Sequence, residues 1–116
     1  MLPPRATPST PRPEPAPART MILFWSPWKQ PQDHRRTDIP AARRARVAAI
    51  LRAGTYFEAW CGWATCRMCG AELGTQDLTG FGFIWPEKAE HYILEHDVWM
   101  PEMDRLLDAA DKAATR

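Results

Sequence analysis

Four residues of metal-ligand type lie in one short stretch of this 116-residue chain: Cys66, Cys69, His91 and His96. Their spacing is C-x2-C-x21-H-x4-H, which places two thiols on a tight turn and two imidazoles downstream. Zinc takes four such donors at about 2.0–2.3 Å in tetrahedral geometry, and closely spaced pairs supply them with little backbone distortion. The sequence therefore predicts a structural Zn2+ site with no coordination position left for a catalytic water.

Other interpretations of these residues explain less of the pattern, so we expect no enzymatic activity. His91–His96 has one residue too many for the H-x-x-E-H motif of inverted zinc peptidases. A redox role for the C-x-x-C pair would leave both histidines unexplained. Cys61 either replaces His96 as a ligand or packs as a small apolar side chain, and packing is favoured because free cysteines are usually buried.

The histidine spacing makes one demand on the local structure. Five residues turn about 140° around an ideal helix, so His91 and His96 do not lie on one straight face. We expect the helix that carries them to tighten or end near His96.

The elements that must position these ligands follow from capping residues and apolar periodicity. A first helix is predicted from Asp38, as N-cap, to Gly54, as a left-handed C-terminal residue. Its buried stripe consists of Val47, Ile50 and Leu51.

Two aromatic strands are expected over residues 55–60 and 81–85, with the ligand turn at 66–70 and a glycine-containing turn region at 74–82. Pro86-Glu87 is predicted to open the helix with the histidines, and Pro101 to interrupt it. A last helix from Glu102 to about Ala113 buries three apolar side chains, Met103, Leu106 and Leu107. The expected fold is α+β: an N-terminal helix, a β-hairpin and helix resembling the ββα core of Cys2His2 fingers, and a C-terminal helix.

The domain organisation follows from composition. Residues 1–20 hold seven of the twelve prolines and predict a disordered or polyproline-like arm, although it stays open whether they are translated, since Met21 begins the first foldable stretch. Residues 21–116 are expected to form one small zinc-binding domain, with 21–28 as an edge strand or a strap over the core. No stretch has the length of a membrane span or a secretory signal, and the cysteine usage fits a reducing cytoplasm.

Roughly residues 45–105 contain a C-x-x-C-G turn followed by a WPE…HY…H.V..P signature. In this respect the sequence resembles a group of small bacterial zinc-finger-like proteins. This chain departs from the pattern after Thr79, where Gly80-Phe81-Gly82 stands in place of Asp-Gly. The resemblance implies a zinc-stabilised fold and carries no activity.

Six tryptophans in so small a chain favour a protein-interaction module with an unidentified protein partner and no small-molecule substrate. Trp25, Trp28 and Trp99 are the predicted interface residues, with a lid over the core as an equal alternative.

Nucleic-acid binding is the second hypothesis, through the arginine-rich helix 41–53 and its four basic side chains, Arg43, Arg44, Arg46 and Arg52. Pairing of these arginines with acids such as Glu87, Glu90 and Asp104 is the simpler expectation, and the acidic histidine helix would be repelled by phosphate. A small bacterial or phage immunity or inhibitor protein is a third possibility and a variant of the first.

Overall fold

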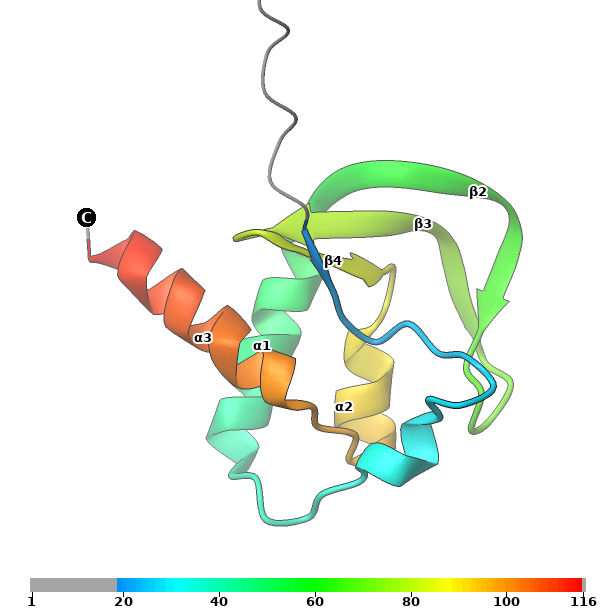
Figure 1. The fold of residues 1–116 in the computed structure, drawn as a ribbon, viewed down its shortest axis with the longest axis horizontal. Helices are drawn as coiled ribbons and strands as arrows, with labels where there is room; N and C mark the ends of the chain where they lie inside the picture. The colour runs from blue at the N-terminus through cyan, green and yellow to red at the C-terminus, as the bar shows by residue number, and fades with distance from the viewer. Residues whose placement is uncertain (1–18, 116) are drawn as a thin grey trace, which may run out of the picture.

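A computed structural model describes residues 19–115, except the side chains of Trp60 and Cys61. The predicted arm therefore lies almost entirely outside the described residues. In the described range the chain forms a mixed α+β domain with three α-helices and a four-stranded sheet (Figure 1). This confirms the predicted α+β class.

The sheet has the strand order β1-β4-β3-β2. Its strands are β1 (Thr20–Met21), β2 (Thr55–Thr65), β3 (Glu72–Gly80) and β4 (Phe83–Pro86). The short strand β1 runs parallel to β4, and the other two pairs are antiparallel. Thr20 pairs with Phe83, and Met21 pairs with Ile84.

The prediction of a turn region at residues 74–82 is wrong, because most of it forms β3. Gly74 lies within the strand, where its φ of +99 favours glycine and where a Cβ would also collide with the Glu87 carboxylate. The turn is confined to Phe81 and Gly82, between β3 and β4. A third strand therefore separates the β2–β3 hairpin from the histidine helix, unlike a ββα finger.

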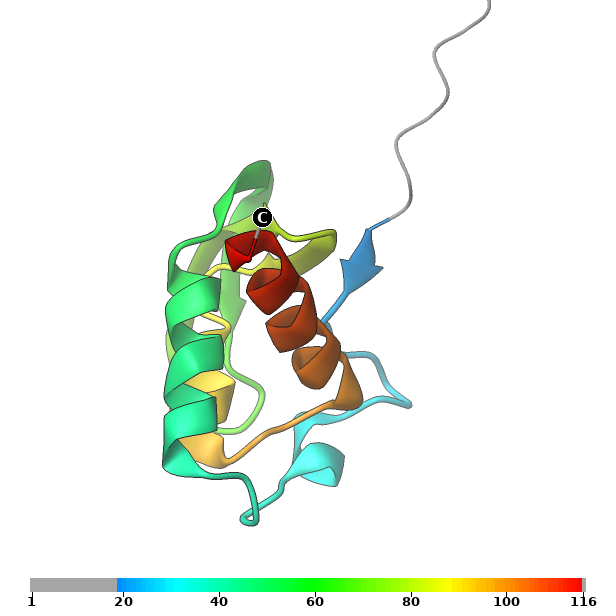
Figure 2. The same cartoon turned by 90° about the vertical axis from the view of Figure 1, so that its left-hand side faces the viewer.

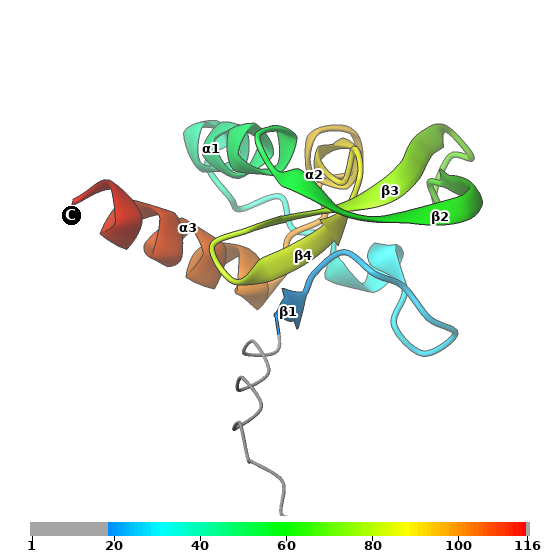
Figure 3. The same cartoon turned by 90° about the horizontal axis from the view of Figure 1, so that it is seen from above.

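Helices pack on the sheet from several sides. The α-helices are α1 (Ala41–Arg52), α2 (Glu90–His96) and α3 (Pro101–Ala114), and η1 (Pro31–His34) is a short 3-10 helix. Helices α1 and α2 lie on one side of the sheet, and the N-terminal strap with η1 lies on the other (Figure 3). Helix α3 runs beside α1 (Figure 2).

Two predicted helix starts lie too early. Helix α1 begins at Ala41 without a side-chain cap, and the Asp38 carboxylate instead accepts hydrogen bonds from the Arg36 guanidinium at 2.7 and 3.0 Å. Helix α2 begins at Glu90, because Pro86 ends β4 and a turn follows. The last helix is confirmed, with Met103, Leu106 and Leu107 fully buried.

Trp85 is the centre of the core below α1. Its indole Nε1 donates a hydrogen bond to the Leu51 carbonyl at 3.0 Å, and the side chain is fully buried. The sequence predicted a left-handed backbone at Gly54, and this prediction is wrong, because its φ is not positive. It is small because a Cβ would lie 2.5 Å from Cζ2 of Trp85. The predicted buried stripe of the first helix is confirmed, because Val47 and Leu51 are fully buried and Ile50 packs against the core.

Candidate metal centre

The first two ligands lie on the turn that joins β2 to β3. The Cys66 amide donates to the Ala71 carbonyl and the Gly70 amide to the Cys66 carbonyl, both at 2.8 Å. Gly70 has φ +78, a conformation that glycine adopts without steric cost. The Met68 amide also donates to Sγ of Cys66 at 3.3 Å, which fixes the turn around that sulfur.

The other two ligands lie on α2, His91 in its first turn and His96 at its last residue. Asp97 follows in the left-handed region with φ 56, and the helix ends there as the histidine spacing required. The two imidazole rings lie 5.0 Å apart between centroids, tilted by 72°.

All four side chains come together. One ligand atom from each of Cys66, Cys69, His91 and His96 lies within 4.8 Å of the other three. Sγ of Cys69 lies 3.3 Å from Nε2 of His91. Tetrahedral zinc with Zn–S about 2.3 Å and Zn–N about 2.0 Å would place such a pair about 3.5 Å apart. The cluster can therefore hold a metal ion.

A second observation fits a metal at this position. Within the described residues, Nε2 of His96 is buried and has no hydrogen-bond partner. A buried polar atom without a partner costs about 1–3 kcal/mol, and coordination to a metal ion would remove that cost. Burial falls across the cluster, from the core residue Cys66, through the half-buried histidines, to the exposed Cys69. Its outer side faces solvent.

Tyr92 supports the site, although sequence reasoning gave it no role. Its hydroxyl oxygen accepts a hydrogen bond from the Arg67 amide at 3.0 Å, inside the C-x-x-C turn. Its ring lies 6.3 Å from the ring of His91 and 6.4 Å from that of His96. Burial raises the pKa of Tyr92, and neighbouring Cys66 adds to that rise. In the sequence, the available signal for this role was that Tyr92 directly follows the predicted ligand His91.

Glu87 joins the β3 strand to the segment that leads into α2. Its carboxylate accepts hydrogen bonds from the Thr75 amide at 3.0 Å and from the Gln76 side chain at 3.3 Å. Its own amide donates to the Gln76 carbonyl at 2.8 Å. Glu87 therefore connects the two ligand-bearing parts of the fold through β3, rather than pairing with the arginine helix as the sequence suggested.

The arginines proposed for nucleic-acid binding are engaged with acids or buried. Arg43 pairs with Asp104 at 2.7 Å, Arg52 with Glu90 at 3.7 Å, and Arg46 with Asp111. The predicted pairing is thus confirmed for Glu90 and Asp104.

Arg44 does not lie on the outer face of α1, as its place among the arginines suggested. Its side chain is 11% exposed and donates to the carbonyls of Ile39, Ile93 and Arg36. Arg44 lies three residues before Val47 and seven before Leu51, and this helical spacing indicates that it shares their buried face.

The predicted interface tryptophans separate into three environments. Trp28 is 87% exposed, as expected of a surface residue. Trp25 is partly buried, with its ring 5.4 Å from that of Tyr92. The prediction of an exposed Trp99 is wrong, because it is 1% exposed and belongs to the core. Three exposed aromatic residues on β2 were missed, Tyr56 at 63%, Phe57 at 37% and Trp63 at 66%.

Comparisons of the chain with protein-family profiles, curated proteins and solved structures find no significant match. Among residues 19–115, no helix is long and apolar enough to span a bilayer. The functional argument therefore depends on the ligand cluster and on the surface around it.

Proposed function

We propose that this protein is a non-enzymatic binding module, held together by one structural Zn2+ ion, that acts by contacting another protein. The observation that carries the proposal is the cluster of four donors within 4.8 Å of one another. Cys66, Cys69, His91 and His96 would hold the ion, and its chemistry there is the coordination of four protein ligands.

The donor set favours zinc and a structural role. Two thiolates and two imidazoles in a tetrahedral arrangement suit zinc, whereas magnesium and calcium prefer oxygen ligands. Four protein ligands fill the tetrahedron, so no position remains for a water or a substrate. This saturation is why the proposal is a binding module and not a zinc hydrolase.

Exposed aromatic side chains support a protein partner. Trp28 stands at the tip of a tight turn, closed by hydrogen bonds between the backbones of Ser26 and Lys29 at 3.0 and 3.1 Å. The turn holds its indole, 87% exposed, away from the core. Large aromatic residues in such positions are typical anchors of protein interfaces.

The proposed zinc site also supports the segment that carries Trp28. The Arg67 guanidinium, between the two cysteines, donates to the Trp25 carbonyl at 3.5 Å. Trp25 in turn packs against Tyr92, whose hydroxyl accepts from the Arg67 amide. An ion that orders the C-x-x-C turn would therefore order the strap beside it. No observation favours nucleic acid, and an immunity or inhibitor role would be one form of protein binding.

The metal half of the proposal is tested by elemental analysis of the purified full chain. We expect about one zinc per chain, lost in Cys69→Ser and His91→Ala. Cys61→Ser is the matched control and should keep its zinc. Wild-type protein that folds with no bound metal would contradict the proposal. Loss of zinc in Cys61→Ser, with retention in His96→Ala, would show that Cys61 is the fourth ligand.

The interface half is tested by capture of partners from an extract of the native host on immobilised full chain. A specific partner should bind the wild type and be lost with Trp28→Ala, while the zinc content and the circular dichroism stay unchanged. Met21→Ala, which removes another exposed apolar side chain, is the control. A partner that binds both variants equally would exclude Trp28 as the anchor.

A further inference from the structure

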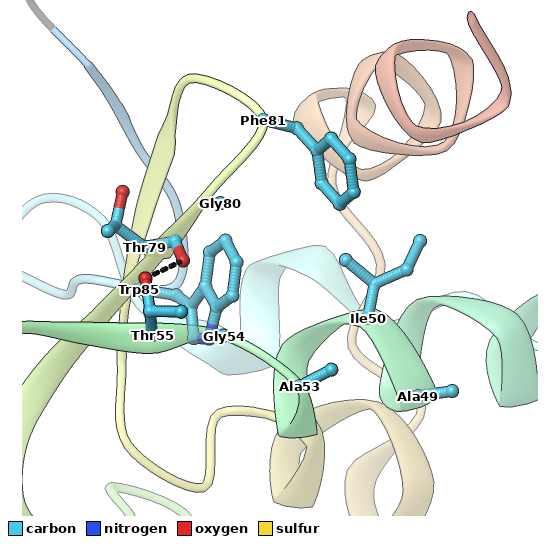
Figure 4. Close-up of a pocket in the computed structure, with 9 residues that line it drawn as sticks. All are labelled: Ala49, Ile50, Ala53, Gly54, Thr55, Thr79, Gly80, Phe81 and Trp85. Atoms are coloured by element: carbon cyan, nitrogen blue, oxygen red, sulfur yellow. Dashed lines mark hydrogen bonds between the residues drawn. The ribbon is translucent and has the colours of Figure 1, made fainter. Parts of the chain in front are cut away.

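An apolar pocket of about 490 Å3 lies between α1 and the β3–β4 turn, with Ile50 and Ala53 on one side and Phe81 on the other (Figure 4). The polar side chains that line it are two threonines, and the Thr55 hydroxyl donates to the Thr79 carbonyl at 3.4 Å. No thiol and no ionisable side chain is among the residues that line this pocket. The metal centre, in contrast, brings two thiols together.

The two cysteines of the metal centre differ in exposure. Cys66 belongs to the core and is 2% exposed, whereas Cys69 is exposed to solvent. Their sulfur atoms lie within 4.8 Å of each other. A disulfide places its sulfur atoms about 2.0 Å apart, so this pair would have to approach by less than about 3 Å to form one. Cys69 is therefore the accessible thiol, and Cys66 is within reach of it as the second.

A bound metal would keep the exposed sulfur in its reactive form. Coordination to Zn2+ deprotonates a thiol, and the thiolate is the nucleophilic form of cysteine. Cysteines that sense oxidants are accessible thiolates, often with a resolving cysteine beside them. Cys69 has the exposure of the first kind of cysteine, and Cys66 has the position of the second.

We propose that the metal centre is also a redox switch, in which hydrogen peroxide oxidises Cys69 and Cys66 to a disulfide and the ion is released. This inference rests on the proposed function, because it requires a bound Zn2+ ion. When both thiolate ligands are consumed, two imidazoles remain, and a structural zinc site needs four protein ligands. The oxidised centre should therefore lose its zinc.

The oxidation has two steps. The Cys69 thiolate attacks the peroxide, an S–O bond forms, the O–O bond breaks, and hydroxide leaves, which gives a sulfenic acid. The Cys66 thiolate then attacks that sulfur, which forms the S–S bond and releases a second hydroxide. Each hydroxide takes up a proton and becomes water. The two sulfurs together lose two electrons, and the peroxide gains two.

The disulfide would change which parts of the fold are joined. The ion would join the C-x-x-C turn to α2, whereas a disulfide joins the turn only to itself. Without the ion, the hydrogen bond from the Arg67 amide to the Tyr92 hydroxyl, at 3.0 Å, would carry more of that connection. The strap depends on the same two residues, since Trp25 packs against Tyr92 and its carbonyl accepts from the Arg67 guanidinium. Oxidation should therefore loosen the strap that presents Trp28 and weaken the binding of a protein partner.

The test is treatment of the purified, zinc-containing full chain with H2O2, while a chromophoric chelator reports the zinc released. We expect about one zinc per chain to be released, together with a Cys66–Cys69 disulfide identified by peptide mass mapping. Dithiothreitol with added zinc should reverse both changes. Hydrogen exchange at the Arg67 amide should be severalfold faster in the oxidised protein. Retained zinc with unmodified thiols, a disulfide to Cys61, or over-oxidation without a disulfide would each overturn the proposal.

Cys69→His separates the switch from the metal site. An imidazole can replace the exposed thiolate as the fourth ligand, so the variant should keep its zinc, but it lacks the second thiol of the disulfide. Its zinc release by H2O2 should be at least about 10-fold slower than that of the wild type, and an equal rate would refute the switch. Cys61→Ser, the matched control, should release zinc at the wild-type rate.

The failure of this inference and the failure of the proposed function give different results. Wild-type protein without zinc would contradict the proposed function. Wild-type protein with zinc that H2O2 does not release would contradict the switch alone. If Cys69→His binds no zinc, the mass mapping of the oxidised wild type decides by itself, because it identifies which sulfurs are joined.

Discussion

The two ends of this small domain are held together by different chemistry. At one end, α1, α3 and β4 meet around side chains that are fully buried and apolar, such as Trp85, Leu51 and Leu106. At the other end, the hairpin turn meets α2 through the four ligands, of which Cys66 is buried in the core, both histidines are partly buried and Cys69 is exposed. Apolar burial stabilises in proportion to the area removed from water, so it explains the first end better than the second, where three of the four ligands are not fully buried.

The difference indicates what a metal ion would do in this fold. The β2–β3 turn extends away from the helices α1 and α3 (Figure 1), and its contribution to the shared core is limited to a few side chains such as Cys66 and Leu73. A metal bound by two ligands from the turn and two from α2 would join these two segments where they share few apolar contacts. The following predictions test whether the two ends respond separately.

Removal of the proposed metal should have the largest effect, and it should act first at the hairpin end. Structural zinc in small fingers binds with apparent free energies of about 10–16 kcal/mol, as much as the whole stability of a domain. We expect Cys69→Ser, or treatment with a strong chelator, to abolish amide protection over residues 64–76 in hydrogen exchange, before α1 loses its own. Equal loss at both ends would show that the two are one cooperative unit.

Trp85→Ala should have the second largest effect, and it should act on the other end. The change removes a fully buried indole and leaves the Leu51 carbonyl without its donor, for an expected loss of about 3–5 kcal/mol in the free energy of unfolding. Urea unfolding in the presence of zinc measures it, and the zinc content should remain that of the wild type. Trp28→Ala is the matched control, with an expected change within about 0.5 kcal/mol. A variant that loses its metal would contradict the separation of the two ends.

The same division explains which features were predictable from the sequence. The ligand set could be predicted because soft donors at short spacing have few other uses, and the cluster of all four side chains agrees with it. The last helix was predictable because Pro101 starts it and Met103, Leu106 and Leu107 repeat at helical spacing. Local signals sufficed for both.

The wrong predictions concern features that depend on distant partners. Gly54 looks like a left-handed residue at the end of a helix, but it is small because the Trp85 indole fills the space of its Cβ, and Gly74, in the predicted turn region, lies within β3 with φ +99 beside Glu87. Trp99 was assigned to the surface because it lies outside the ligand hairpin and near Pro101, yet it is buried in the core. Arg44 belongs to the buried stripe of α1, where backbone carbonyls from other elements satisfy its guanidinium.

Arg44 contacts both ends of the domain, so its replacement should lower both the stability of the fold and the affinity for zinc. From α1, its guanidinium donates to the Ile93 carbonyl in α2 and lies 3.8 Å from Asp97, the residue after the ligand His96. Arg44→Met keeps the aliphatic stem and removes these contacts. We expect a loss of about 2–3 kcal/mol in the free energy of unfolding, because hydrogen bonds to a charged donor are lost in a buried place. Zinc affinity should fall about 10-fold, as for other changes that support ligands indirectly.

The matched control for Arg44 is Arg46→Met, two residues along the same helix. Its ion pair with Asp111 is exposed, so the expected loss is about 0.5 kcal/mol or less, with no change in zinc affinity. Competition with a chromophoric chelator measures the affinity, and urea unfolding measures the stability. If both variants behave alike, the contact between α1 and the end of α2 does not hold His96 in place.

Tyr92→Phe should have the smallest effect, and it should be confined to the metal end. The variant keeps the ring against Trp25 and His91 but leaves the Arg67 amide without its acceptor, for an expected loss of about 1–2 kcal/mol. Hydrogen exchange should accelerate at the amides of residues 66–70 and stay unchanged in α3. Tyr56→Phe, which removes an exposed hydroxyl, is the control. Faster exchange in α3 would mean that the hydroxyl stabilises the whole domain, and the division between an ion-dependent end and an apolar end would then fail.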